Sequence, residues 1–154
     1  MAQSLAQLLA AEIGAVQRFI ALLKEEQEAL RASRLEALEN LTETKRGLVD
    51  ELSRLGAARQ DCFAAAGSAA DRDGIERWLR THPDPRLLPA WQALQQLAQE
   101  AKTLNELNGR IIAILAHNNR KLLETLRAPR AGIGVYGPDG QTSAGPASRI
   151  SDSV

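Results

Sequence analysis

With 154 residues, 44% of them apolar and only 3% aromatic, the chain is long enough for one domain, whose core must be aliphatic. Nineteen basic and nineteen acidic residues give a net charge of zero, without the single-sign block of five or more charges that nucleic acid or an anionic membrane would attract. The single cysteine, Cys62, excludes an intramolecular disulfide and fits a reducing compartment. Polar residues interrupt the apolar positions near the N-terminus, so we expect no signal peptide, no membrane insertion and a cytoplasmic protein.

Leucine and alanine at helical spacing predict an all-α protein that begins with a long helix over residues 2–31. The apolar positions of this helix follow the alternating spacing of a heptad seam: Leu9, Ile13, Val16, Ile20, Leu23 and Leu30. Ser33 stands three residues before Glu36, which predicts a capping box and a second helix over residues 33–66. The short hinge at Ala32 then makes the two helices an antiparallel hairpin.

The second helix has a seam of its own, formed by Leu38, Leu41, Lys45, Leu48, Leu52 and Leu55. An irregular connector follows, and within it Asp71 or Asp73 is expected to cap a short helix over residues 71–80 that carries Trp78. The His82–Pro85 segment ends this helix.

A third long helix is predicted over residues 86–127, where Ala128 and Pro129 end it. We therefore expect an antiparallel bundle of three long helices with coiled-coil seams over residues 1–127 and a flexible tail over residues 128–154. At ~1.5 Å per residue the third helix would be roughly 60 Å long and the first two roughly 45 to 50 Å, so the end of the third should overhang the hairpin.

The third helix carries more apolar surface than a simple bundle needs. One seam contains Trp91, Leu94, Ala98, Ala101, Ile112, Leu115, Leu122 and Leu126, and a second stripe beside it contains Leu104, Leu107, Ile111 and Ile114. Either face could be the covered one, and Asn105, Asn108 and Asn119 accordingly either fix a buried register or face water. The surplus apolar surface is typical of a docking surface for another helix.

The motifs that suggest chemistry are weak. Residues 132–137 match the dinucleotide pattern G-x-G-x-x-G, but a helix precedes them and none is expected to follow, so we expect no nucleotide. His82 and His117 lack the neighbouring carboxylates of a metal site, and Cys62 lacks a nearby group that would activate it. The sequence therefore predicts no enzyme, no cofactor and no metal.

Three segments, taken together, resemble one known family. They are Leu41–Lys45 in the second helix, Leu104–Gly109 in the third, and Tyr136–Ser143 in the tail, which is the most specific of the three. Together they resemble the FlgN family of flagellar export chaperones, which are small cytoplasmic all-helical proteins that bind the two hook–filament junction proteins (flagellar hook-associated proteins) before their secretion. The resemblance extends over essentially the whole chain.

The resemblance implies that the distal third helix holds the amphipathic C-terminal segment of a junction protein and keeps it from assembling prematurely. The residues that it assigns to client binding are Leu104, Leu107, Asn108, Ile111, Ile112, Leu115, Asn119, Leu122 and Leu126. It also implies that the tail docks on the cytoplasmic domain of the flagellar export gate through Tyr136, together with Gly137, Asp139 and Gly140.

The rival interpretation is a coiled-coil scaffold or adaptor that self-associates through its third helix. A large stable oligomer would favour the scaffold, whereas a monomer or a weak homodimer would favour the chaperone.

Overall fold

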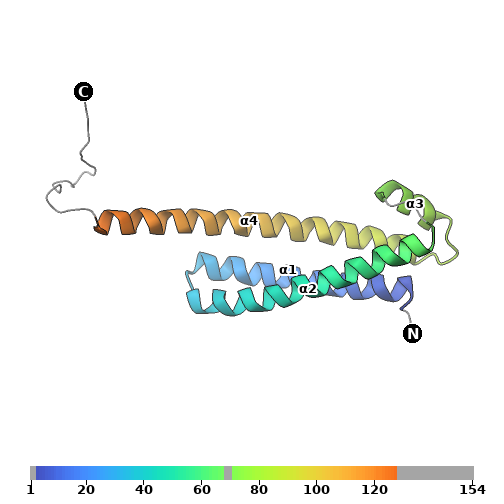
Figure 1. Cartoon of the computed structure of the whole chain (residues 1–154), viewed down its shortest axis with the longest axis horizontal. Helices are drawn as coiled ribbons and strands as arrows, with labels where there is room; N and C mark the ends of the chain where they lie inside the picture. The colour runs from blue at the N-terminus through green and yellow to red at the C-terminus, as the bar shows by residue number, and fades with distance from the viewer. Residues whose placement is uncertain (1–2, 68–70, 128–154) are drawn as a thin grey trace, which may run out of the picture. The chain divides into compact units, whose positions relative to one another are not determined.

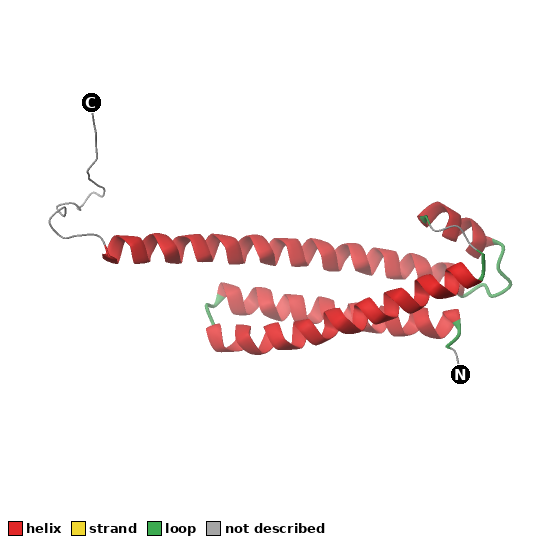
Figure 2. Cartoon of the chain, in the orientation of Figure 1, coloured by secondary structure: helices red, strands yellow, loops and turns green. Residues whose placement is uncertain are grey.

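The computed structural model of the chain describes residues 3–67 and 71–127. Within these ranges the chain forms helices and no strand, which confirms the all-α prediction (Figures 1 and 2). The helices are α1 (Leu5–Arg31), α2 (Leu35–Ala65), α3 (Arg72–Arg80) and α4 (Leu87–Arg127). Each begins and ends within three residues of the range that the sequence pattern predicts. The structure divides into two units, Met1–Ile112 and Ala113–Val154, which we describe separately.

A capping box that the sequence analysis missed starts α1. The Ser4 hydroxyl oxygen accepts a hydrogen bond from the Gln7 backbone N–H at 3.2 Å, and Gln7 Oε1 accepts one from the Ser4 backbone N–H at 2.9 Å. These two reciprocal bonds satisfy two of the backbone donors that a helix N-terminus leaves free.

The predicted capping box at Ser33 is wrong, because Ser33 belongs to the end of α1 rather than to the start of α2. Its backbone N–H bonds to the Leu30 carbonyl, while the Arg34 N–H reaches back to the Ala29 carbonyl at 2.9 Å. This pair of bonds is a Schellman motif, which requires a left-handed residue just past the helix, and Ser33 accordingly has φ 55°. Arg34 then precedes α2 without a side-chain cap.

The first two helices form an antiparallel hairpin within the first unit (Figure 1). Its core is mainly the buried side of α1, against which α2 contributes the buried residues Leu48 and Phe63. By composition α1 is apolar and long enough to cross a membrane, with a mean hydropathy of 1.4 over its most apolar stretch. In this structure half of that stretch is buried, and its buried apolar side chains belong to the core cluster that also includes residues of α2 and α4.

Asp71 caps the N-terminus of the short helix α3, because its Oδ1 accepts a hydrogen bond from the Gly74 N–H at 2.7 Å. Of the two predicted caps, Asp71 and Asp73, the structure therefore shows Asp71. Its Trp78 stacks edge-on against Phe63 of α2, with ring centroids 5.9 Å apart. Phe63 also meets Trp91 of α4 edge-on at 5.4 Å. Phe63 therefore connects α2, α3 and α4 through ring contacts.

The loop before α4 is held by Asp84. Its carboxylate accepts hydrogen bonds from the backbone N–H and the guanidinium of Arg86, and the His82 ring nitrogen Nδ1 accepts one from the Asp84 N–H. The bonds from Arg86 lower the pKa of Asp84 from 3.8 to about 2. Pro89 lies in the first turn of α4. Its missing N–H costs no hydrogen bond there, because the N–H groups of the first turn have no acceptor within the helix.

The first part of α4 packs against the hairpin along one face. The buried residues of this face are Leu87, Trp91, Leu94, Ala101 and Asn108. The structure thus decides an alternative that the sequence left open: up to Asn108 the covered face contains Trp91, Leu94 and Ala101 of the first predicted seam. Ala98 of that seam is exposed, and Leu97 and Leu104 are half-buried.

Candidate functional site

Two buried glutamates of α1 link the three long helices of the first unit. The first is Glu12, whose carboxylate accepts two hydrogen bonds from the guanidinium of Arg59 on α2, at 2.7 and 3.2 Å. The same guanidinium lies 5.2 Å from the ring centroid of Trp91 on α4. A buried glutamate and a half-buried arginine therefore join α1 to α2, and the arginine also stacks against α4.

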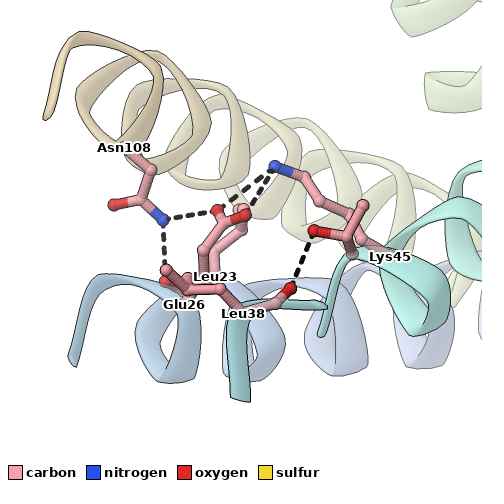
Figure 3. A network of polar contacts seen from close by, with 6 residues as sticks. Leu23, Glu26, Leu38, Lys45 and Asn108 are labelled. Carbon is pink, nitrogen blue, oxygen red and sulfur yellow. Dashed lines mark hydrogen bonds and ion pairs between the residues drawn. The ribbon is translucent and has the colours of Figure 1, made fainter. Parts of the chain in front are cut away.

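The second buried glutamate is Glu26, shown in Figure 3. Lys45 Nζ of α2 lies 3.2 and 3.3 Å from its two carboxylate oxygens. On the other side, Asn108 Nδ2 of α4 donates to Glu26 Oε1 at 2.9 Å and to the Leu23 carbonyl at 2.8 Å. Asn108 is fully buried, so these bonds replace the water that its NH₂ group would otherwise bind.

The two pairs share one spacing, which fixes the register of the hairpin. Glu12 and Glu26 are fourteen residues apart on α1, and their partners Lys45 and Arg59 are fourteen apart on α2. A slip of one heptad would leave both glutamates facing residues without a positive charge, at a cost of several kcal/mol for each buried carboxylate.

Sequence reasoning missed both glutamates, although a signal was present. Eight buried residues of α1 follow an unbroken three–four alternation: Leu5, Leu8, Glu12, Ala15, Phe19, Leu22, Glu26 and Ala29. The two glutamates occupy positions of an apolar seam, and Lys45 occupies a seam position of the next helix. A charge at such a position predicts a buried partner of opposite sign.

The structure places the predicted client-binding residues of the first unit in different environments. Leu104 is half-buried and packs against the core, and Ile111 is also half-buried. Asn108 departs from the prediction, because its burial and its bonds to α1 withdraw it from any exposed surface. Leu107 and Ile112 are exposed, Ile112 at 43%.

In the second unit the predicted client-binding residues are all exposed. Leu115, Leu122 and Leu126 expose 37%, 58% and 72% of their surface, and Asn119 is exposed as well. At 100° per residue these four side chains fall within an arc of about 60° around the helix axis. We call these four residues the leucine stripe. Exposed leucines gathered on one line of a helix are unusual for a solvated surface.

The charged residues of this helix segment lie away from the leucine stripe. They are Arg120, Lys121, Glu124 and Arg127. Helical geometry places each of them at least about 80° from the nearest stripe residue. The segment is therefore amphipathic although the described residues cover neither face.

The predicted gate-docking residues, Tyr136, Gly137, Asp139 and Gly140, lie outside the described residues, as does the whole predicted tail of residues 128–154. A search of the described part of the chain found no group of three or more histidine, cysteine, aspartate or glutamate side chains that could hold a metal ion.

Comparison with known proteins connects this helical chain with the flagellum. A family model described as FlgN protein matches residues 1–144. Among solved structures, the chain is similar to the crystal structure of a Pseudomonas aeruginosa protein assigned as the flagella synthesis protein FlgN, with 33% sequence identity and a TM-score of 0.66 over 82% of this chain and 100% of that chain. Among curated proteins no match was found. The resemblance seen in three sequence segments is thereby confirmed, and the chain belongs to the FlgN family, with a role related to the flagellum.

Proposed function

We propose that this protein is a cytoplasmic export chaperone of the flagellar type III secretion system. It binds the amphipathic C-terminal segments of hook–filament junction proteins, prevents their premature assembly and delivers them to the export gate. Membership of the FlgN family supports the flagellar role, and the resemblance supports this choice of client.

The observation that carries the proposal is the leucine stripe. An amphipathic client helix that lies along it would remove the exposed parts of Leu115, Leu122 and Leu126 from water. Burial of a fully exposed leucine contributes about 1.5 to 3 kcal/mol, and each of these side chains would contribute the fraction that it now exposes. In such helix-in-groove recognition the client binds through its own apolar residues, which recur at helical spacing along one face of its helix. Leu107, Ile111 and Ile112 of the first unit are further residues that the resemblance assigns to client binding, and of these Leu107 and Ile112 are exposed.

Two carboxylates placed in the leucine stripe provide the test. The variant Leu122→Asp/Leu126→Asp should lose the client complex, measured by light scattering after size-exclusion chromatography with junction-protein C-terminal segments. A matched control, Ala113→Asp/His117→Asp, adds two carboxylates to the opposite, exposed side of the same helix segment. Circular dichroism should show nearly equal helix content in both variants. Client binding that survives in the stripe variant, or fails equally in the control, would overturn the proposed site.

The second part of the proposal assigns gate docking to the tail around Tyr136. Tyr136→Ala should leave the client complex intact and weaken binding to the cytoplasmic domain of the export gate at least tenfold, with Gln141→Ala as a tail control. An equal loss of both interactions would rule out two separate sites.

A further inference from the structure

We propose that the end of α4 pairs with the same segment of a second copy of this chain, as a short parallel two-stranded coiled coil. The pairing stands on the pattern of this helix alone. Its regulatory meaning rests on the proposed function, because the pairing covers the leucine stripe of the free protein and a client must displace it.

The heptad positions of the stripe favour two strands. In the sequence Ile112, Asn119 and Leu126 occupy successive a positions, while Leu115 and Leu122 occupy the d positions between them. Leucine at both d positions and isoleucine at one of the three a positions, Ile112 at the end of the first unit, favour a parallel dimer. A single asparagine at an a position, here Asn119, specifies the register and the two-stranded state at some cost in stability.

Asn119 also argues for a second copy as the occupant. In a parallel homodimer each a residue faces the same a residue of the other copy, so the two Asn119 amides can donate to and accept from each other. In an antiparallel pair, a positions face d positions, and Asn119 would lie against leucine without a partner. A different protein would have to place an amide directly opposite Asn119. In a symmetric parallel dimer the Asn119 of the second copy lies there automatically.

The residues that flank the stripe permit this pairing. Its e and g positions are Ala116, Asn118, Leu123 and Thr125, none of which is charged. In a parallel coiled coil these positions approach each other across the interface, where like charges would repel. All four charged residues of the second unit's described helix occupy b, c or f positions and would stay in water.

The interface is short, so the dimer should be weak. Five a and d layers correspond to fewer than the three to four heptads of a stable coiled coil, so we expect the dimer to form only at high protein concentration. A weak pairing protects the leucines from unspecific association and still yields to a client that binds more tightly.

Sedimentation equilibrium of the full chain from about 5 to about 500 µM tests the pairing in the absence of any client. The wild type should shift from monomer to dimer, and Asn119→Asp should remain monomeric because it brings two carboxylates into one layer. His117→Asp, which adds the same charge at an f position, should dimerise like the wild type. A wild type that stays monomeric throughout, or an Asn119→Asp variant that dimerises equally well, overturns the proposal.

The direction of the pairing is tested by a disulfide. In a Cys62→Ala background, Leu126→Cys should form an intermolecular disulfide under mild oxidation, because only a parallel pair brings the two 126 positions within the roughly 7 Å between Cα atoms that a disulfide allows. A dimer that forms without this disulfide overturns the parallel arrangement.

Client binding measured at about 5 µM chaperone, where the protein is monomeric, separates this proposal from the proposed function. Client binding together with a monomeric wild type at all concentrations refutes the pairing alone. A dimer that binds no client refutes the chaperone function alone. If both hold, the apparent affinity for the client must fall as the chaperone concentration rises.

Discussion

Asn108 of α4 donates a hydrogen bond to the buried carboxylate of Glu26 on α1, over 2.9 Å. Its second acceptor is the Leu23 carbonyl, so both contacts of the side chain require the amide NH₂ group. This fixes the orientation of the amide, because a flipped Asn108 would turn its oxygen toward two acceptors. Lys45 completes the contacts of the same carboxylate from α2.

Asn108→Leu should lower the free energy of unfolding by about 1 to 3 kcal/mol, since it removes a donor from the buried carboxylate of Glu26 and another from the Leu23 carbonyl. Asn108→Asp should cost more, because it places a second carboxylate beside Glu26. Urea unfolding followed by circular dichroism measures both. Asn105→Leu, at an exposed asparagine of the same helix, should change stability by less than about 0.5 kcal/mol. An equal loss for Asn105→Leu and Asn108→Leu would contradict the structural role of Asn108.

Arg59→Met should destabilise the first unit by about 3 kcal/mol, because it leaves the Glu12 carboxylate buried without its partner. The double variant Glu12→Leu/Arg59→Met should recover most of that loss, since no unpaired charge is then buried at this position. Denaturant unfolding of the two variants gives the comparison.

A surface pair on the same two helices serves as the control for Arg59. Arg18 holds the pKa of the Glu51 carboxyl below its usual value by a direct hydrogen bond, but water reaches both side chains. Arg18→Met should therefore cost far less stability than Arg59→Met. A loss as large as that of Arg59→Met would mean that burial does not distinguish the two pairs.

Ser33→Gly should stabilise the protein by about 0.5 to 1 kcal/mol, because glycine adopts the left-handed conformation of Ser33 without strain. The comparable change Ser53→Gly, at an exposed position inside α2, should destabilise it by about 0.5 kcal/mol. The melting temperatures of the two variants should shift in opposite directions. A destabilised Ser33→Gly variant would instead support the capping box that the sequence predicted at Ser33.

The loop before α4 should weaken in acid. The pKa of Asp84 is about 2 in the folded chain and 3.8 ordinarily, so its interactions with Arg86 stabilise the folded state fully above about pH 4 and are lost as the pH falls toward 2. The carboxyl carbon of Asp84 should titrate near pH 2 by nuclear magnetic resonance, and Arg86→Gln should raise that midpoint toward 3.8. A midpoint near 3.8 in the wild type would show that the Arg86 bonds do not persist in solution.

The helices could be predicted closely from the sequence because periodicity and helix-breaking residues are local signals. Two features needed the packed structure. Ser33 fits both a capping box and a Schellman motif, and the choice depends on where the chain turns between α1 and α2. Asn108 lies on a seam of α4, where it could either fix a buried register or face water, and only its hydrogen bond to Glu26 across the interface shows that it is buried.

The leucine stripe was identifiable as surplus apolar surface, because α4 carries more apolar positions than one covered face requires. Its exposure at Leu122 and Leu126 agrees with that interpretation, but client binding there stays a prediction. The role of Tyr136 likewise stays a prediction, since it lies outside the described residues.

Every described residue of α4 from Ile112 onward is exposed, so this end of the helix draws almost no stability from packing. Its amide hydrogens should exchange with water quickly, while those between Trp91 and Asn108 in the same helix exchange slowly. A partner that binds this end selects the helical form of a fluctuating segment, and part of its binding enthalpy is the enthalpy of helix formation. The affinity can therefore be tuned through helix propensity at residues that face away from the partner, without any change in the residues that touch it.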